Sequence, residues 1–290
     1  MTTQAGTILV TGGTGNTGVP LVARLREAGI PYRAVSRAAP EDVSTAREHV
    51  RFDWEDESTH GPALEGIARV YLVAPALVGD PERLMVPFLR RALEAGVRRA
   101  VLLSSSAIPE GGPALGQVHQ AVRELMPEWG VLQPSWFMQN FTAGMHGPSI
   151  KASGEIVTAT GEGRVAFVDA GDIAAVAFRA LTDTEPHNRT HVLTGPQALS
   201  YAEAAAVLSE AWHRPVRHVS VGGAQLRSRL EGFGIPSGYA ALLAGLDEAI
   251  KNGAEDRVIS TVLDITGRPP KSLYDFARDN AALWGASAEG

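Results

Sequence analysis

The sequence predicts an α/β fold, in which a doubly wound parallel sheet is joined to a smaller, mainly helical lobe. In the first 150 residues, short apolar runs alternate with amphipathic stretches of helical spacing. After about residue 140 this alternation is replaced by irregular short strands and then by successive helices. We therefore expect a sheet domain over residues 1–150, with 165–195 packing on it, and a separate lobe over 196–290.

The expected strands of the sheet are short apolar runs bounded by turn residues. They span Thr7–Val10, Tyr32–Val35, Val50–Phe52, Val70–Val73, Ala100–Leu103 and Val131–Leu132. Between most of them lie helical stretches such as Val19–Ala28, Glu82–Ala95 and Ala114–Met126. Gly29 and Gly96 each follow a predicted helix and precede a strand, where a left-handed C-cap is commonly needed. Strands that alternate with helices predict a parallel sheet covered on both faces.

The remainder of the chain predicts short strands and then mostly helices. The strands are Gly154–Thr160, Arg164–Val168, His191–Leu193 and Arg217–Val221. The helices are Ile173–Leu181, Tyr201–Trp212, Ala224–Phe233, Tyr239–Asn252 and Ser272–Leu283. Ligands of open α/β sheets bind outside the carboxyl ends of the strands, so we expect this lobe to close a pocket there.

Composition excludes several classes of protein. Of the 290 residues, 44% are hydrophobic and 20% are charged, as in ordinary globular proteins. The net charge of -6 gives no general attraction for nucleic acid or anionic lipid. The absence of cysteine excludes disulfides, thiolate nucleophiles and cysteine metal sites. No apolar stretch approaches a membrane span, and no secretory signal precedes the first strand, so the expected location is the cytoplasm.

A glycine-rich loop directly follows the first strand and begins the first helix. Glycine suits the tight turn, the close approach of backbone to a pyrophosphate and close packing of helix on strand. Strand, turn and helix together predict dinucleotide binding on a Rossmann fold, although a glycine-rich turn without a ligand is the alternative. The residues expected to bind the pyrophosphate are Gly12, Thr14, Gly15, Asn16, Thr17 and Gly18.

The end of the second strand predicts which dinucleotide is bound. A cofactor without the 2′-phosphate normally needs a carboxylate there, whereas Ser36 and Arg37 offer a hydroxyl and a guanidinium. We therefore expect NADP(H), with a solvated Arg37 as the alternative. Asp53 and Trp54 after the third strand, and Ala74 and Pro75 after the fourth, are expected to border the adenosine part of the groove.

With these residues in view, the chain resembles the NmrA-like branch of the atypical short-chain dehydrogenases/reductases. The resemblance rests on Thr11–Gly18, the Ser36-Arg37 pair, Leu102–Ser106, Gln133–Phe141 and Asp169–Ala174. Within the branch, Pro134–Phe141 most resembles proteins of ergot alkaloid biosynthesis, which reduce an iminium or rearrange an alkaloid intermediate. The resemblance implies an atypical NAD(P)-dependent oxidoreductase.

The chain lacks the Tyr-x-x-x-Lys pair that supplies a proton in ordinary members of the superfamily, because no tyrosine has lysine four positions later. His119 and Arg123 are the titratable residues of the helix where that pair would stand. His119 is therefore a candidate proton donor or orienting group, with a plain helix residue as the alternative. Ser104 and Ser105, at a strand end, are candidates to contact nicotinamide ribose or substrate, with strand-end capping as the alternative.

Aromatic residues after the sixth strand are expected to form the wall beside the nicotinamide. These are Trp136 and Phe137, with Pro134 before them, and core packing is the alternative for Phe137. His187 and His191 have a spacing of four, but the residues between them resemble a turn entering a strand. We therefore expect no metal site.

The pattern as a whole favours an NADPH-dependent reductase of specialised metabolism that acts on a small imine, iminium or conjugated substrate. Hydride addition to an iminium gives a neutral amine, so the missing acid would not matter. The alternatives are a quinone reductase or cyclase-isomerase on the same fold, and a regulator that senses dinucleotide, as the resemblance to NmrA implies. The expected partner is a small molecule, with neither nucleic acid nor membrane, and the expected state is a monomer or homodimer.

Overall fold

The computed structural model describes residues 6–37 and 49–284. The chain divides into two units, the first made of Met1–Pro134 and Ala170–Val192, and the second of Ser135–Asp169 and Leu193–Gly290. This division differs from the expected boundaries at 150 and 196. The segment after Pro134 falls in the second unit because it pairs there: the backbone N–H of Ser135 donates to Leu193, and Phe137 forms a bridge with Val168.

The first unit contains a seven-stranded sheet with the order β3-β2-β1-β4-β5-β6-β9. The strands are β1 (Thr7–Thr11), β2 (Tyr32–Ser36), β3 (His49–Arg51), β4 (Ile67–Leu72), β5 (Arg99–Leu103), β6 (Glu128–Pro134) and β9 (Arg189–Leu193). The register places Val10 beside Ala34 of β2 and Tyr71 of β4, in parallel pairs. The predicted doubly wound α/β fold is thus confirmed, and β9 adds the edge strand beside β6.

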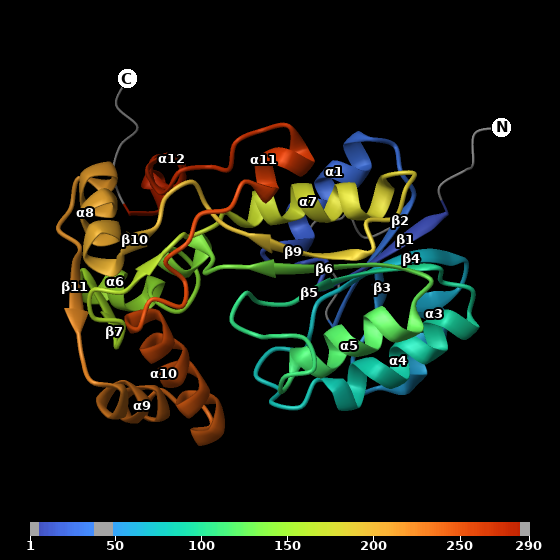
Figure 1. Cartoon of the computed structure of the whole chain (residues 1–290), viewed down its shortest axis with the longest axis horizontal. Helices are drawn as coiled ribbons and strands as arrows, with labels where there is room; N and C mark the ends of the chain where they lie inside the picture. Colours follow the sequence, from blue (N-terminus) through green and yellow to red (C-terminus); the bar gives the residue numbers. More distant parts are fainter. Residues whose placement is uncertain (1–5, 38–48, 285–290) are drawn as a thin grey trace. The chain divides into compact units, whose positions relative to one another are not determined.

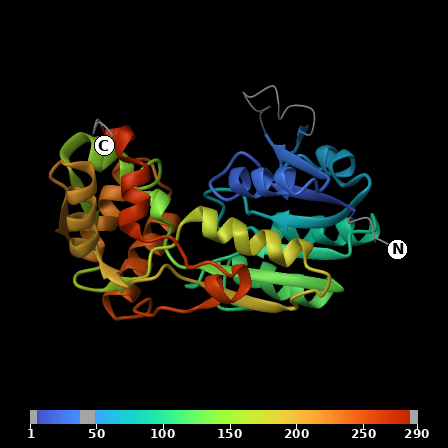
Figure 2. The ribbon, with the colours of Figure 1, turned by 90° about the horizontal axis from the view of Figure 1, so that it is seen from above.

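Helices cover both faces of this sheet (Figure 1). Helices α1 (Gly18–Glu27) and α7 (Ala170–Thr182) lie side by side on one face, as Figure 2 also shows. On the other face lie α4 (Glu82–Glu94) and α5 (Leu115–Leu125), and the short α3 (His60–Leu64) follows the turn η1 (Glu57–Thr59). Gly29 and Gly96 have φ values of 66° and 96°, so both predicted left-handed turns are present.

The end of α7 is fastened to β4 and β5 by two arginines. Arg99 is 2% exposed, and its guanidinium pairs with Glu128 at 2.7 Å and donates to the carbonyl of Asp183 at 2.6 Å. Arg69 donates to the carbonyl of Leu181 at 2.8 Å. A buried guanidinium needs such acceptors, so the last turn of α7 completes the environment of Arg99.

The second unit has two small strand pairs packed with helices. The strands are β7 (Glu155–Thr158) with β11 (Arg217–Ser220), in parallel, and β8 (Arg164–Val165) with β10 (Leu199–Ser200), antiparallel. The helices are η2 (Met138–Phe141), α6 (Gly147–Ser153), α8 (Tyr201–Trp212), α9 (Gly223–Gly232), α10 (Ser237–Lys251), α11 (Thr261–Thr266), α12 (Leu273–Asp279) and η3 (Ala281–Trp284). In the described part of the chain, no helix combines the length and the apolar character needed to cross a bilayer.

The core of the second unit forms around α8, whose start is capped by Ser200 and Glu203 in a reciprocal pair of hydrogen bonds. Trp212, at the other end of α8, is buried, donates from its indole to the carbonyl of Ala277 at 2.8 Å and stacks on Trp284. These contacts fix α12 and η3 against α8. In place of the single helix predicted over 272–283, the structure has two shorter helices, α12 and η3.

Candidate functional site

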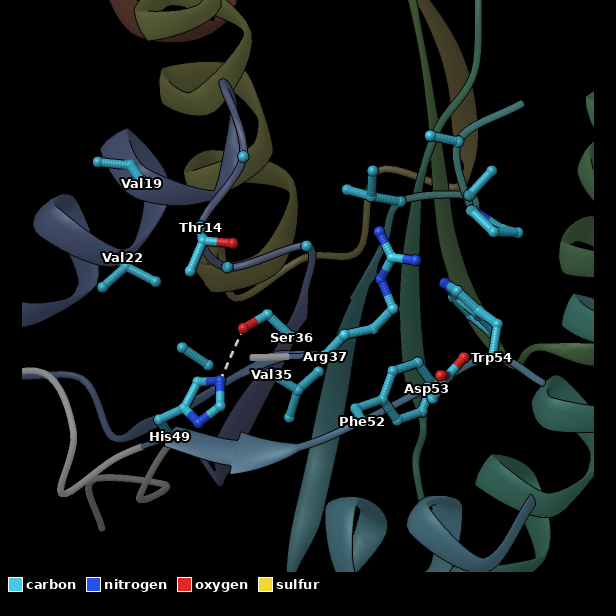
Figure 3. Close-up of a pocket in the computed structure, with 18 of the residues that line it drawn as sticks. Thr14, Val19, Val22, Val35, Ser36, Arg37, His49, Phe52, Asp53 and Trp54 are labelled. Atoms are coloured by element: carbon cyan, nitrogen blue, oxygen red, sulfur yellow. Dashed lines mark hydrogen bonds between the residues drawn. The ribbon is translucent and has the colours of Figure 1, made fainter. Parts of the chain in front are cut away.

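A cleft of about 1030 Å³ lies at the carboxyl ends of β1, β2, β3 and β4, within the first unit (Figure 3). The strand order reverses at β1 and β4, because β2 and β3 lie on one side of β1 and the later strands on the other. In open parallel sheets such a switch point is where ligands bind. The cleft is lined by the loops after these strands and by one side of α1.

Glycines determine the shape of the loop after β1. Gly12 has a φ of 63°, in the left-handed region that favours glycine. The N–H of Gly13 donates to the carbonyl of Val35 at 3.1 Å, and a Cβ on Gly13 would lie 2.9 Å from the Cβ of Ala34. A Cβ on Gly18 would lie only 2.1 Å from the carbonyl oxygen of Gly12. These contacts allow α1 to begin directly against the end of β1.

The first turn of α1 carries no acidic residue. The leading N–H groups of a helix lack partners within it and carry positive potential, which suits a phosphate. Thr17, just before the helix, accepts a hydrogen bond from the hydroxyl of Tyr71 at 3.2 Å. Thr11 donates to the Tyr71 carbonyl at 3.0 Å and accepts from the N–H of Val73 at 2.7 Å. These hydrogen bonds hold the glycine-rich loop after β1 against β4.

Tyr71 acts here as a structural donor. Its side chain is fully buried, and burial raises the pKa of the hydroxyl well above its usual range, so the proton stays on the oxygen. Because this hydroxyl is occupied by Thr17, Tyr71 does not supply the acid that the missing Tyr-x-x-x-Lys pair would provide.

The end of β2 presents a hydroxyl, a guanidinium and an imidazole. Ser36 Oγ and His49 Nε2 lie 2.8 Å apart, and Arg37 extends into the cleft (Figure 3). Burial lowers the pKa of His49. Ser36 and Arg37 were predicted from the sequence, whereas His49 was not, because only the register of β3, with His49 beside Ala34, brings it to this end of the cleft.

The far wall of the cleft is aromatic and rigid. Trp54 is 9% exposed and packs edge to face against Phe52 and Phe88, with ring centroids 4.9 Å and 5.1 Å away. Asp53 is held through its backbone, since its N–H donates to Thr59 at 3.1 Å. Its carboxylate accepts from the N–H of Glu55 at 3.1 Å.

The structure brings many of the predicted cofactor residues together. Those that line the cleft are Gly12, Thr14, Gly15, Ser36, Arg37, Asp53, Trp54, Ala74 and Pro75. Asn16, Thr17 and Gly18 lie in the adjoining loop and first helical turn. The lining also includes residues that were not predicted from the sequence, among them Val19, Val22, Arg26, His49 and Val78.

The remaining predicted cofactor residues lie outside this cleft. Ser104 follows β5, is buried, and its hydroxyl has no partner among the described residues. Pro134 ends β6. Trp136 and Phe137 belong to the second unit, where Trp136 lines a small pocket of that unit. Their roles toward a cofactor stay predictions.

The predicted catalytic residues His119 and Ser105 both lie in the first unit, outside the lining of the cleft. His119 is 2% exposed, with Nε2 3.0 Å from the hydroxyl of Thr190 and 3.7 Å from a carboxylate oxygen of Glu110. The same carboxylate pairs with Arg123 at 2.8 Å. Burial lowers the pKa of His119 although Glu110 opposes this. The catalytic roles of His119 and Ser105 stay predictions.

His187 and His191 bond to each other. Nδ1 of His187 lies 2.8 Å from Nε2 of His191, and Nε2 of His187 lies 3.2 Å from a carboxylate oxygen of Asp183. Burial, followed by the charge of His187, lowers the pKa of His191 to about 4. Within residues 6–37 and 49–284, no group of three or more His, Asp or Glu side chains is arranged to hold a metal ion.

Comparison with known proteins assigns the family. The sequence profile of the NmrA-like family matches residues 4–267. The chain belongs to the NmrA-like family. It is 48% identical over 277 residues to the uncharacterized oxidoreductase YesF of Bacillus subtilis, covering 96% of each chain. It is 37% identical to agroclavine dehydrogenase of Claviceps fusiformis, over 96% of this chain and 98% of that one.

The fold is also that of a solved structure. The NADPH complex of the quinone oxidoreductase QOR2 of Escherichia coli superposes with a TM-score of 0.79 at 23% identity, covering 94% of this chain and 99% of that one. With the glycine-loop cleft, the full-length relatives establish this NmrA-like protein as an NAD(P)-dependent oxidoreductase. The predicted resemblance to this family is thus confirmed.

Proposed function

We propose that the cofactor of this NmrA-like protein is NADP(H), with a preference for the phosphorylated form. The supporting observation is the end of β2, where Arg37 extends into the cleft beside the Ser36–His49 pair and no carboxylate ends the strand. A guanidinium forms strong, charge-assisted bonds with phosphate oxygens, whereas ribose hydroxyls are usually bound by a carboxylate at this position. The glycine loop and the first turn of α1 would hold the pyrophosphate.

We propose further that the substrate is a small imine, iminium or conjugated molecule of specialised metabolism. The observation that carries this proposal is the absence of a Tyr-x-x-x-Lys pair from the whole sequence. Bound NADPH would supply hydride, and a ketone would then also need a proton for its alkoxide, whereas a cationic iminium becomes a neutral amine without one. A neutral imine would first take a proton from water to become the iminium, and the enolate formed from a conjugated carbonyl is a weaker base than an alkoxide and would take its proton from water. The 37% identity to an agroclavine dehydrogenase supports a nitrogen-containing substrate.

The chain's own residues would contribute by binding and orientation. His119, held by Thr190 and Glu110, would orient the substrate, directly or through a bound water, and Ser105 would contact the substrate or nicotinamide ribose. Proximity and exclusion of water are large rate terms in reactions that need no acid.

The decisive experiment follows the absorbance of NADPH in the presence of purified protein and a substrate panel. The panel contains a cyclic iminium, an azo compound, a conjugated enone, a quinone and a simple ketone. We expect turnover with the iminium or a conjugated compound and none with the simple ketone. One control reaction contains protein and substrate without added cofactor, and a second contains NADH in place of NADPH.

Two results would contradict the proposal. Fast reduction of the simple ketone would show that a proton donor is present. Tight NADPH binding without turnover of any compound would instead indicate a protein that senses the dinucleotide and would contradict the proposed substrate class.

A further inference from the structure

The second unit contains a small pocket of about 30 Å³, which shares no lining residue with the proposed cofactor cleft. On this measure one water-sized group takes roughly 10–15 Å³, so the pocket accommodates about two such groups. Its walls come from α8, α9, α10 and the segments around η2 and β7. Most lining side chains are apolar or aromatic, including Trp136, Met145, Tyr201, Leu226 and Leu230.

One carboxylate enters this apolar lining. Asp247, on α10, accepts a hydrogen bond from the backbone N–H of Ala159 at 2.8 Å, just after β7. No arginine or lysine of the described residues forms an ion pair with it, while the ionised carboxylates elsewhere on α9 and β7 have such partners: Glu231 pairs with Arg227 and Glu155 with Arg217. A carboxylate accepts several hydrogen bonds, and here a single donor is supplied.

The titratable side chains in contact with the pocket, other than Asp247, are neutral at neutral pH, and the carboxylate of Glu162 lies outside the lining, near His218. Burial lowers the pKa of His146 to about 4, and lowers that of His218, whose ring lies 5.8 Å from that of Tyr201 and whose Nε2 bonds to Thr158. Burial raises the pKa of the Tyr201 hydroxyl well above its usual range. Burial also raises the pKa of Asp247 to about 6, so this carboxylate is largely ionised above that pH. The pocket thus carries one negative charge.

A partly buried carboxylate without a cationic partner is costly, and a ligand cation would remove that cost. The indole of Trp136 and the phenol of Tyr201 add aromatic rings, which attract a cation over their faces. We propose that this pocket binds the ammonium end of a small organic amine, with Asp247 as its counter-ion. The size of the pocket fits a methylammonium group, with the remainder of the amine outside.

The test uses the full chain without cofactor, so its outcome is independent of the proposed reductase activity. Benzylamine, cationic at neutral pH, is compared with benzyl alcohol, its neutral counterpart, by calorimetry and by quenching of tryptophan fluorescence. We expect only the amine to bind. A Trp136→Phe variant identifies which indole reports binding: its fluorescence quenching should be lost, and its calorimetric affinity for benzylamine should fall less than that of the Asp247 variant, because the phenyl ring that remains attracts a cation less strongly than indole does.

The Asp247→Asn variant isolates the charge, because its amide oxygen still accepts from the N–H of Ala159. We expect it to weaken benzylamine binding at least about tenfold, as for loss of a charge-assisted contact. Glu248→Gln is the matched control, since Glu248 is exposed, neighbours Asp247 on α10 and does not line the pocket. In the natural protein, amine affinity should fall as pH falls through about 6, as Asp247 becomes protonated.

Three results would overturn the proposal. They are equal binding of amine and alcohol, full amine affinity in Asp247→Asn, and no amine binding to the natural protein at neutral pH. Thermal unfolding of Asp247→Asn checks that its fold is kept; if it is not, the pH dependence of the natural protein decides alone, since a carboxylate that only accepts from Ala159 would leave amine binding unaffected by pH.

Discussion

The cleft of the first unit and the pocket of the second unit select charge in opposite ways. The cleft presents backbone N–H groups at the start of α1 and the guanidinium of Arg37, so it suits phosphates. The pocket presents a single carboxylate, Asp247, within apolar walls, so it suits a cation. Backbone donors are positioned by the turn itself, whereas a lone side-chain charge depends on packing from several elements. The two sites should therefore respond differently to mutation.

The largest effect on NADPH binding is expected in the glycine loop, where the cofactor must approach the backbone closely. Gly15→Val should abolish NADPH binding while the protein stays folded, because a Cβ there meets only the Gly12 carbonyl oxygen at 3.2 Å but a branched side chain takes the space of the pyrophosphate. Gly18→Ala should instead destabilise the fold, since its Cβ would lie 2.1 Å from that oxygen. We expect the free energy of unfolding to fall by about 1–3 kcal/mol or more, the usual cost of overpacking a site.

Calorimetry with NADPH and thermal unfolding of both glycine variants measure these effects. Undiminished NADPH binding by Gly15→Val would place the nucleotide elsewhere. If Gly15→Val unfolds, circular dichroism will show it, and Gly15→Ala, with its smaller side chain, then takes its place.

Arg37→Ala tests the side-chain part of the cleft. Loss of one charge-assisted phosphate contact, about 1.5–3 kcal/mol, should weaken NADPH binding by about tenfold to about 150-fold. Affinity for NADH, which lacks the phosphate, should stay unchanged. Arg51→Ala is the control, because Arg51 is nearby and exposed, and it does not line the cleft. Equal affinity of the natural protein for both cofactors would reject the NADP(H) preference.

His119→Ala asks whether a proton is delivered. With an iminium substrate, turnover should fall by no more than about tenfold, whereas loss of a general acid costs about 10²–10⁴-fold. A deuterated cofactor first establishes that hydride transfer limits the rate. If His119 were the acid, kcat would fall as pH rises through its pKa, and the variant would lose that limb. Such a result would move the substrate toward a carbonyl or quinone.

The smallest effect concerns His49. Because burial lowers its pKa, His49 is neutral in the free protein near neutral pH, and a bound phosphate would favour its protonated form. Its contribution to NADPH affinity is therefore present at low pH and lost as pH rises. The ratio of the NADPH affinities of the natural protein and His49→Asn is measured at each pH, because the titration of the phosphate itself affects both proteins equally and cancels in this ratio. We expect a difference of at most about fivefold, as for a partly exposed charge contact, and no difference at any pH would exclude the contact.

The sequence was sufficient for the cleft of the first unit because its determinants are local. The glycines after β1 and the Ser36-Arg37 pair after β2 are consecutive residues, and strand-helix alternation places them at one sheet edge. His49 was missed because its place depends on which residue of β3 pairs with Ala34. A strand of only three residues, such as β3, carries too short a hydrophobic pattern to specify its register in a parallel sheet.

The second unit was less predictable for the same reason. Its helices α8 and α10 were expected from periodicity, but the pocket joins Trp136, Tyr201 and Asp247, which are distant in the chain.

In the first unit, the edge strand β9 was predicted from the sequence only as a short apolar run. Its membership of the main sheet beside β6 depends on contacts such as that between Asn188 and Trp129, whose backbone N–H donates to the Asn188 side chain at 2.9 Å.

The way in which the chain is divided bears on its biosynthesis. The first unit is assembled from Met1–Pro134 and Ala170–Val192, so a growing chain makes part of the second unit before the first is complete. Until the end of α7 emerges from the ribosome, Arg69 and Arg99 lack their carbonyl acceptors there, and until β9 emerges β6 has a free edge. Nascent chains in which β6 has emerged and β9 has not are thus the stage most exposed to aggregation and to chaperones, and neither unit can be produced by simple truncation.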